Sequence, residues 1–196
     1  MIGQTAPCLS HQVQGELAPK PVTEALHQTG TWTVHLLLIS LAITPLRTIT
    51  HWSRLVDIRR MVGVAASIYL AIHFALYIYD QKGDMLRVAS EITLRFYLTI
   101  GFVALLGLFA LGITSTDGWV KRLGGVKWNK LHRTIYWLTV LALIHAFLQS
   151  KVDVSDWVLL SGLFMAMMMW RFAKKRAAVG YGRLFVIAVV AAIATA

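Results

Sequence analysis

Hydrophobic residues gather in five runs along the chain, and polar segments separate them. The runs cover residues 31–46, 58–79, 93–115, 131–150 and 154–172. A helix needs about 20 apolar residues to cross the roughly 30 Å of hydrocarbon in a bilayer, so runs of this length predict transmembrane helices. The first run is short and ends at Pro45. The pattern predicts an all-α integral membrane protein, a bundle of about five transmembrane helices.

Polar segments divide the chain into three parts. Residues 1–30 form a polar N-terminal segment, which we interpret as a loop or short interfacial pieces. Residues 31–176 form the transmembrane domain, where Gly101, Gly107 and Gly112 predict close helix contacts. Residues 177–196 form a C-terminal apolar extension, and the apolar piece within it, 184–196, is too short to span a bilayer alone.

The composition agrees with a membrane protein. Hydrophobic residues make up 57% of the chain and charged residues 14%, whereas soluble domains carry about 25% charged residues. The net charge is +10, but the basic residues flank the apolar runs as membrane topology requires, so we exclude nucleic acid as a partner. The only cysteine is Cys8. No disulfide can therefore form within the chain, and no Cys-x-x-Cys-His motif can attach a haem covalently.

The basic residues also predict an orientation. With five spans, the segments 47–60, 117–133 and 171–183 share one side and hold 14 of the 19 Lys and Arg residues. The positive-inside rule makes that side cytoplasmic and leaves residues 1–30 outside. No secretory signal is visible at the start of the chain. An external N-terminal tail without a signal is unusual, so we expect a further span to precede Met1.

Two histidines, His73 and His145, lie inside the second and fourth runs. Both runs cross from inside to outside, and the two imidazoles reach a similar depth toward the outer face. Each histidine could simply bond to a neighbouring helix, but a pair at matched depth favours two ligands of one metal. Two neutral imidazoles saturate haem iron, which favours electron transfer over oxygen binding. Zinc would need further ligands, and none is available at this depth.

The other histidines are weaker candidates. We interpret His11, His27 and His51 as solvated or interfacial residues. His35 lies near the outer end of the first run, where a polar residue costs little.

His132 lies at the cytoplasmic end of the fourth run, 13 residues before His145. On a continuous helix the two rings would lie roughly 20 Å apart and on different faces. His132 is either an ordinary interfacial histidine or a ligand of a second, inner haem. Alternatively, Arg59 and Arg60, together with the basic segment 121–133, bind the phosphate of a flavin.

Several segments resemble one family. They are HQTG at 27–30, LAITPLR at 41–47, RRMVG at 59–63, LAIHFALY at 70–77, LTIGF at 98–102 and the long stretch ITSTDGWVKRLGGVKWNKLHRTIYWLTVLALIH at 113–145. Over roughly residues 15 to 176 the chain is similar to the haem-binding membrane subunits of bacterial periplasmic methionine sulfoxide reductase systems, within the ferric-reductase-like transmembrane group.

The resemblance implies a function as well as a fold. It implies a haem b protein of the bacterial inner membrane, with FMN as a further cofactor. Electrons would come from quinol or a cytoplasmic flavin reductase and pass to a periplasmic molybdenum-cofactor enzyme that repairs oxidised methionine. It also implies that His73 and His145 ligate the outer haem and that His132 is needed for haem loading. The chain would be an electron-transfer subunit rather than a self-contained enzyme.

The chain departs from the family at both ends. The family has a span before the HxTG stretch, which this sequence lacks, and residues 184–196 lie beyond the family's usual end.

Two other functions compete with this one. A self-contained ferric or cupric reductase would need a nucleotide-binding domain, and the chain has no G-x-G-x-x-G fingerprint. A proton-coupled transporter would need acidic residues within its spans, and the middles of the last four runs contain none.

Overall fold

The computed structural model describes residues 21–150 and 154–176. The expectations for Cys8, His11 and the segment 184–196 lie outside these residues.

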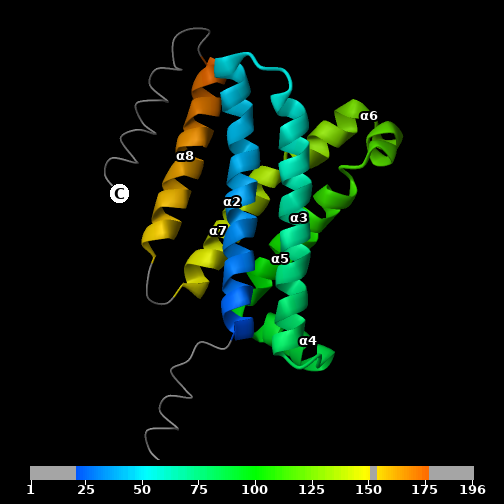
Figure 1. Ribbon diagram of the computed structural model, residues 1–196, viewed down its shortest axis with the longest axis vertical. Helices are drawn as coiled ribbons and strands as arrows, with labels where there is room; N and C mark the ends of the chain where they lie inside the picture. The colour runs from blue at the N-terminus through cyan, green and yellow to red at the C-terminus, as the bar shows by residue number, and fades with distance from the viewer. Residues whose placement is uncertain (1–20, 151–153, 177–196) are drawn as a thin grey trace, which may run out of the picture.

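The described part of the chain consists of helices joined by short connections, with no strand. The helices are α2 (Pro21–Thr50), α3 (Leu55–Asp80), α4 (Met85–Leu94), α5 (Phe96–Ile113), α6 (Asp117–His132), α7 (Ile135–Gln149) and α8 (Ser155–Arg176). Helices α2, α3, α5, α7 and α8 form a bundle, while α4 and α6 lie toward its opposite ends (Figure 1). The predicted all-α membrane fold is confirmed.

Three of the described helices, α2, α3 and α5, are long and apolar enough to cross a membrane. The α6–α7 pair qualifies as one broken span, because the two helices meet at a bend of 44°. Helix α8 has 22 residues and therefore the length for a crossing, but it is less apolar than these three. The bundle thus has three or four clear span candidates where the sequence predicted about five.

Helix α2 differs from its prediction at both ends. Residues 21–30 are helical, so the expected loop is wrong there; Pro21 occupies the first position of the helix, where proline needs no N–H partner. The helix also continues through Pro45 to Thr50. Because Pro45 has no N–H, the carbonyl of Leu41 loses its helical partner. Arg171 of α8 replaces it, and its Nη2 donates to the Leu41 oxygen at 2.8 Å.

The third and fourth predicted runs are each interrupted. Arg95 is extended, with φ −107° and ψ 106°, and separates α4 from α5. Asp84 caps the start of helix α4, and its side chain accepts the Arg87 N–H at 3.0 Å. In the fourth run, Arg133 and Thr134 separate α6 from α7. Helix α7 is therefore only 15 residues long, or about 22 Å, which is too short to cross a bilayer alone.

Two apolar clusters hold the bundle together, and α2 contributes to both. One lies between α2, α7 and α8 and contains Val34, Leu38, Leu41, Leu143, Leu160, Phe164 and Met167. The other lies between α2, α3 and α5 and contains Leu37, Ala66, Leu70, Leu105 and Leu108. Because α2 is shared, it fixes the position of α3 relative to α7 and α8.

The predicted close contacts at the α5 glycines are confirmed. A Cβ atom at Gly107 would collide with Leu138 of α7, and one at Gly112 would lie 2.6 Å from the Ser67 hydroxyl of α3. The third glycine, Gly101, belongs to the candidate site.

Candidate functional site

His73 projects from α3 against the first turns of α2. Its imidazole lies on Gly30, where an added Cβ would be 3.0 Å from the ring Cε1. Nδ1 lies 3.0 Å from the carbonyl oxygen of Leu26. A carbonyl oxygen only accepts, so Nδ1 carries the proton and Nε2 keeps its lone pair.

His145 uses the same arrangement on a different pair of helices. Its ring, on α7, lies against Gly101 of α5, where a Cβ would be 2.6 Å from Nδ1. Nδ1–H donates to the carbonyl oxygen of Tyr97 at 2.8 Å. Leu26 and Tyr97 each precede their glycine by four residues. The carbonyl and the glycine therefore lie one helical turn apart on the same face. Because the glycine has no side chain, the imidazole can approach the carbonyl that lies one turn before it.

The two histidines lie toward the same end of the bundle. His73 is seven residues before the end of α3 at Asp80, and His145 is four residues before the end of α7 at Gln149. The end of α3 lies beside α4 and the end of α7 beside the start of α8, both toward the lower end of the view (Figure 1). The two rings are close enough for a charge on one to act on the other. The structure thus brings the two predicted residues toward the same end of the bundle, and their role as a ligand pair stays a prediction.

The donor set fits a haem better than a bare metal ion. Within the described residues, no three His, Cys, Asp or Glu side chains form a metal-binding group. Nδ1 is the only nitrogen of either ring that bonds to another described residue. Metal-binding histidines usually donate their second N–H to a carbonyl or carboxylate, which orients the ring. Two such rings, each with Nε2 available, would suit haem iron as ligands.

Sequence reasoning missed Tyr77 and Arg95 near this pair. Tyr77 lies one turn after His73 on α3, and its buried hydroxyl has no partner among the described residues. Arg95 pairs with Glu91 at 2.5 Å and donates to the Tyr97 hydroxyl at 3.1 Å. A hydroxyl without an acceptor and a cation suit the carboxylates of haem propionates. The spacing of four from His73 was a signal for Tyr77; the sequence held none for Arg95.

His132 is held differently, with both ring nitrogens engaged. Nδ1 lies 3.2 Å from the Trp128 carbonyl and Nε2 lies 3.3 Å from the Ser115 hydroxyl. The ring stacks on Trp128 with centroids 3.8 Å apart, and the indole N–H donates to the Thr114 carbonyl at 2.8 Å. These contacts fasten the end of α6 to the end of α5. Because the chain bends between His132 and His145, the spacing expected for one straight helix does not apply.

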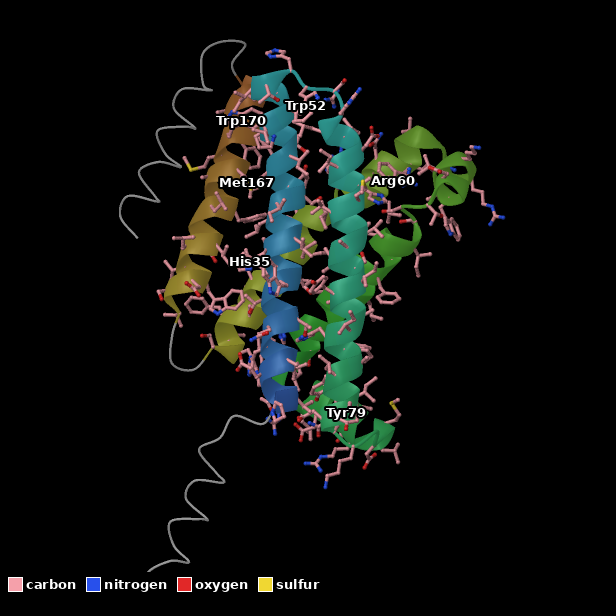
Figure 2. All side chains as sticks on the ribbon, in the orientation of Figure 1. His35, Trp52, Arg60, Tyr79, Met167 and Trp170 are labelled. Atoms are coloured by element: carbon pink, nitrogen blue, oxygen red, sulfur yellow. The ribbon has the colours of Figure 1, made fainter. Side chains whose placement is uncertain are left out.

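Arg59 and Arg60, expected to act together, have separate surroundings. Nη1 of Arg60 donates to Asp117 of α6 at 2.7 Å, an exposed ion pair (Figure 2 marks Arg60). Arg59 instead lines a cleft of about 560 Å³ between α2, α3 and α8. It is also close enough to His132 for its charge to act on that ring.

The remaining described histidines agree with their weaker ranking. His27 and His51 are exposed, as predicted. Nδ1 of His35 bonds to the carbonyl of Thr31 at 2.8 Å, one turn back on its own helix. His35 therefore makes no link to a neighbouring helix of the kind that His73 and His145 make.

The fold and site define a class: a multi-pass helical membrane protein that presents two matched histidines near one end of its bundle. The family described as "Ferric reductase like transmembrane component" matches residues 29–143. The protein-methionine-sulfoxide reductase heme-binding subunit MsrQ of Xanthomonas axonopodis pv. citri is 41% identical over 83% of this chain and 74% of its own length. The corresponding subunit of Caulobacter vibrioides is 37% identical over 80% and 75%. No solved structure matches. The chain belongs to the ferric reductase-like transmembrane family and, within it, to the MsrQ haem-binding subunits.

Proposed function

We propose that this protein is a haem b electron-transfer subunit that carries electrons across a bacterial inner membrane to a methionine sulfoxide reductase. The observation that best supports this is the repeated arrangement at His73 and His145. Each ring lies on a glycine and donates Nδ1–H to a backbone carbonyl. The relatives' names as haem-binding subunits agree with it.

The chain's own residues prepare the site for an electron carrier. The Nδ1–H bonds fix the ring orientations and make Nε2 a better donor to a metal. His73 and His145 would hold the iron through their Nε2 atoms, and two such ligands would favour electron transfer over oxygen chemistry. Bound haem supplies a one-electron iron couple. Since Cys8 is the only cysteine, attachment is non-covalent, as in haem b.

The distribution of charge supports a direction. The basic residues gather at the end that holds α6 and the end of α8, opposite His73 and His145. The positive-inside rule places that end in the cytoplasm. Quinol or a cytoplasmic flavin reductase would deliver electrons from the inner side. A periplasmic, molybdopterin-dependent methionine sulfoxide reductase would receive them near the histidine pair.

A second cofactor, either another haem or FMN, would be held near Arg59 and His132 at the basic end. The closeness of Arg59 to His132 supports this placement. To ligate iron through Nε2, His132 would have to leave Ser115. Arg60 is tied to Asp117, and we propose that it braces α3 against α6 instead.

The alternative function is direct reduction of ferric or cupric ions, which the family description favours. The two functions differ in the acceptor at the outer end. Protein-bound methionine sulfoxide, with a purified reductase partner, should reoxidise the reduced protein faster than ferric citrate does. A faster reaction with ferric citrate would favour the alternative.

The haem assignment is tested by bound haem per chain and by the visible spectrum. The purified protein should show a low-spin haem b spectrum. His73→Ala and His145→Ala should each lose most of the haem, since either change removes one axial ligand. His35→Ala, a histidine of the same bundle bonded only within its own helix, is the matched control and should retain it. Full haem content in both ligand variants would refute the assignment.

A further inference from the structure

Helix α6 lies outside the bundle and beside it. It projects sideways near the basic end, beyond α3 (Figure 1), and none of its residues is buried. Its start is held by the ion pair of Asp117 with Arg60. Arg60 is five residues after Leu55, the first residue of α3, so this contact lies about 8 Å along α3 from its end. Helix α6 therefore runs alongside the inner ends of the spans, at the depth of lipid head groups.

Gly124 divides α6 into two short helices. Its φ of +72° and ψ of 152° are not helical and lie in a region that favours glycine. The second half is fastened to the end of α5, where the Trp128 indole donates to the Thr114 carbonyl and the His132 ring contacts Ser115. The first half, residues 117–124, has only the exposed ion pair of Asp117 as a polar link to the bundle among the described residues.

The first half of α6 is amphipathic. Trp119, Val120 and Leu123 fall within about 100° of one another around the helix, and Lys121 and Arg122 occupy the remaining side. None of the three apolar side chains is buried, and Trp119 is 39% exposed. The Arg122 guanidinium lies 5.7 Å from the centre of the Trp119 ring. A tryptophan next to a cation is typical of the interface between a membrane and water.

The cations of α6 and of the residue that follows it lack acidic partners. Asp117 is the one acidic residue of the segment 117–133, and it already pairs with Arg60. The side chains without an ion pair to any described residue, here called the α6 cations, are Lys121, Arg122, Lys127, Lys130 and Arg133. Clusters of four to eight Lys and Arg residues beside a span are typical of segments that bind anionic lipids.

We propose that α6 lies on the inner leaflet of the membrane and binds the head groups of anionic phospholipids. The face of Trp119, Val120 and Leu123 enters the boundary of the acyl chains, and the α6 cations contact lipid phosphates. A membrane surface satisfies both faces at once, because it offers apolar chains below a layer of negative charge. A soluble acidic protein would match only the charges, and it would have to reach a helix that lies beside the spans and not beyond their ends.

The proposal does not rest on the haem assignment, because no α6 cation contacts His73 or His145 and the two regions lie at opposite ends of the bundle. Bound haem can therefore report the integrity of the fold in each variant.

Nitroxide labels test the depth of α6. In full-length protein that carries Cys8→Ser, a label is attached at Leu123→Cys or, separately, at Lys121→Cys, and the protein is placed in nanodiscs of phosphatidylcholine and phosphatidylglycerol. The label at position 123 should collide more with oxygen, which concentrates in lipid, than with a water-soluble nickel chelate. The label at position 121 should show the reverse. A label at position 123 that the nickel chelate reaches as readily as position 121, or that neither reagent reaches, would overturn the proposal and favour a protein as the occupant.

Lipid retention tests the preference for negative charge. Native mass spectrometry measures the phosphatidylglycerol and phosphatidylcholine that each full-length chain retains after extraction from mixed nanodiscs. The α6 variant combines Lys121→Gln, Arg122→Gln and Lys127→Gln. The control removes the same charge from exposed residues at the same end outside α6, and combines Arg47→Gln, Arg54→Gln and Lys174→Gln.

The unaltered protein should retain phosphatidylglycerol in preference to phosphatidylcholine, and the control should keep most of that preference. The α6 variant should lower it by about tenfold, because each cation near an anionic surface adds to the attraction. Equal losses in the two variants, or no preference in the unaltered protein, would overturn the proposal.

Discussion

The two ends of the bundle treat their polar side chains in opposite ways. Near α4, His73 and His145 are half-buried and each is fixed by one bond to the backbone of the neighbouring helix. At the basic end, Arg47 and Arg59 lack partners among the described residues, while His132 has both nitrogens occupied. One end thus holds two rings that a single backbone bond orients, and the other holds two arginines without a polar partner among the described residues. The same helices α2 and α3 build both ends.

The largest effect should come from adding a side chain to a glycine against which a histidine ring packs. Gly101→Ala would place a methyl group 2.6 Å from His145 Nδ1, so the ring must leave the Tyr97 carbonyl. We expect bound haem to fall about as far as in His145→Ala. Gly30→Ala meets His73 at 3.0 Å and should be milder. Haem per chain measures both, and Gly162→Ala, which meets nothing within 4 Å, is the control. A normal haem content in Gly101→Ala would show that haem binding does not depend on the packing of His145 against Gly101.

The next effect concerns the stability of the basic half of the bundle. Arg171→Gln leaves the Leu41 carbonyl without its partner and removes the bond from Arg171 to the Tyr136 hydroxyl, at 2.6 Å. A lost partner for a buried polar group costs about 1–3 kcal/mol of unfolding free energy. Thermal unfolding in detergent would measure it.

A second substitution separates the two roles of Arg171. Pro45→Ala restores an N–H that can donate to the Leu41 carbonyl. In the Arg171→Gln background it should therefore lower the free energy of unfolding less than it does in the unaltered protein, or raise it. Equal effects of Pro45→Ala in both backgrounds would show that the two residues are not coupled.

His132→Ala should have a smaller effect, confined to the basic end of the bundle. It removes the stack on Trp128 and the contact with Ser115, which together contribute about 1–2 kcal/mol. The haem held by His73 and His145 should remain, with an unchanged low-spin spectrum. Reduction from the cytoplasmic side should slow if a second cofactor lies there. Loss of all haem would mean that the two ends are not independent.

Tyr77→Phe should have the smallest effect. If the Tyr77 hydroxyl donates to a haem propionate, its loss leaves more negative charge near the iron and lowers the midpoint potential. One hydrogen bond of about 1 kcal/mol corresponds to on the order of 40 mV for a one-electron couple. Tyr79→Phe, an exposed tyrosine two residues on, is the control. Redox titration followed at the haem α band would measure both, and an equal shift in both variants would contradict the role.

The position of His73 and His145 toward one end of the bundle was predictable, because the place of a residue along a spanning helix follows from its place within an apolar run; their role as ligands stays a prediction. The packing of each ring against a glycine was not predictable, since the sequence does not say which helices are neighbours. The separation of Arg59 from Arg60 was predictable from geometry alone: consecutive residues point about 100° apart on a helix. Apolar periodicity could not reveal the break at Arg133 and Thr134, because neither proline nor glycine marks it. The polar residues 21–30 form helix because a span can extend beyond the hydrocarbon.

The bond between Arg171 and Leu41 joins positions 130 residues apart and sets an order for biosynthesis. Ribosomes deliver α2 to the membrane before α8, when its Leu41 carbonyl has no donor. In a medium without water that vacancy remains unfavourable until α8 has been synthesised and has docked. The inner half of the first described helix is therefore completed only by the last one. Chains truncated before Arg171 should accordingly be substrates for membrane quality-control proteases, even though they contain every histidine of the site.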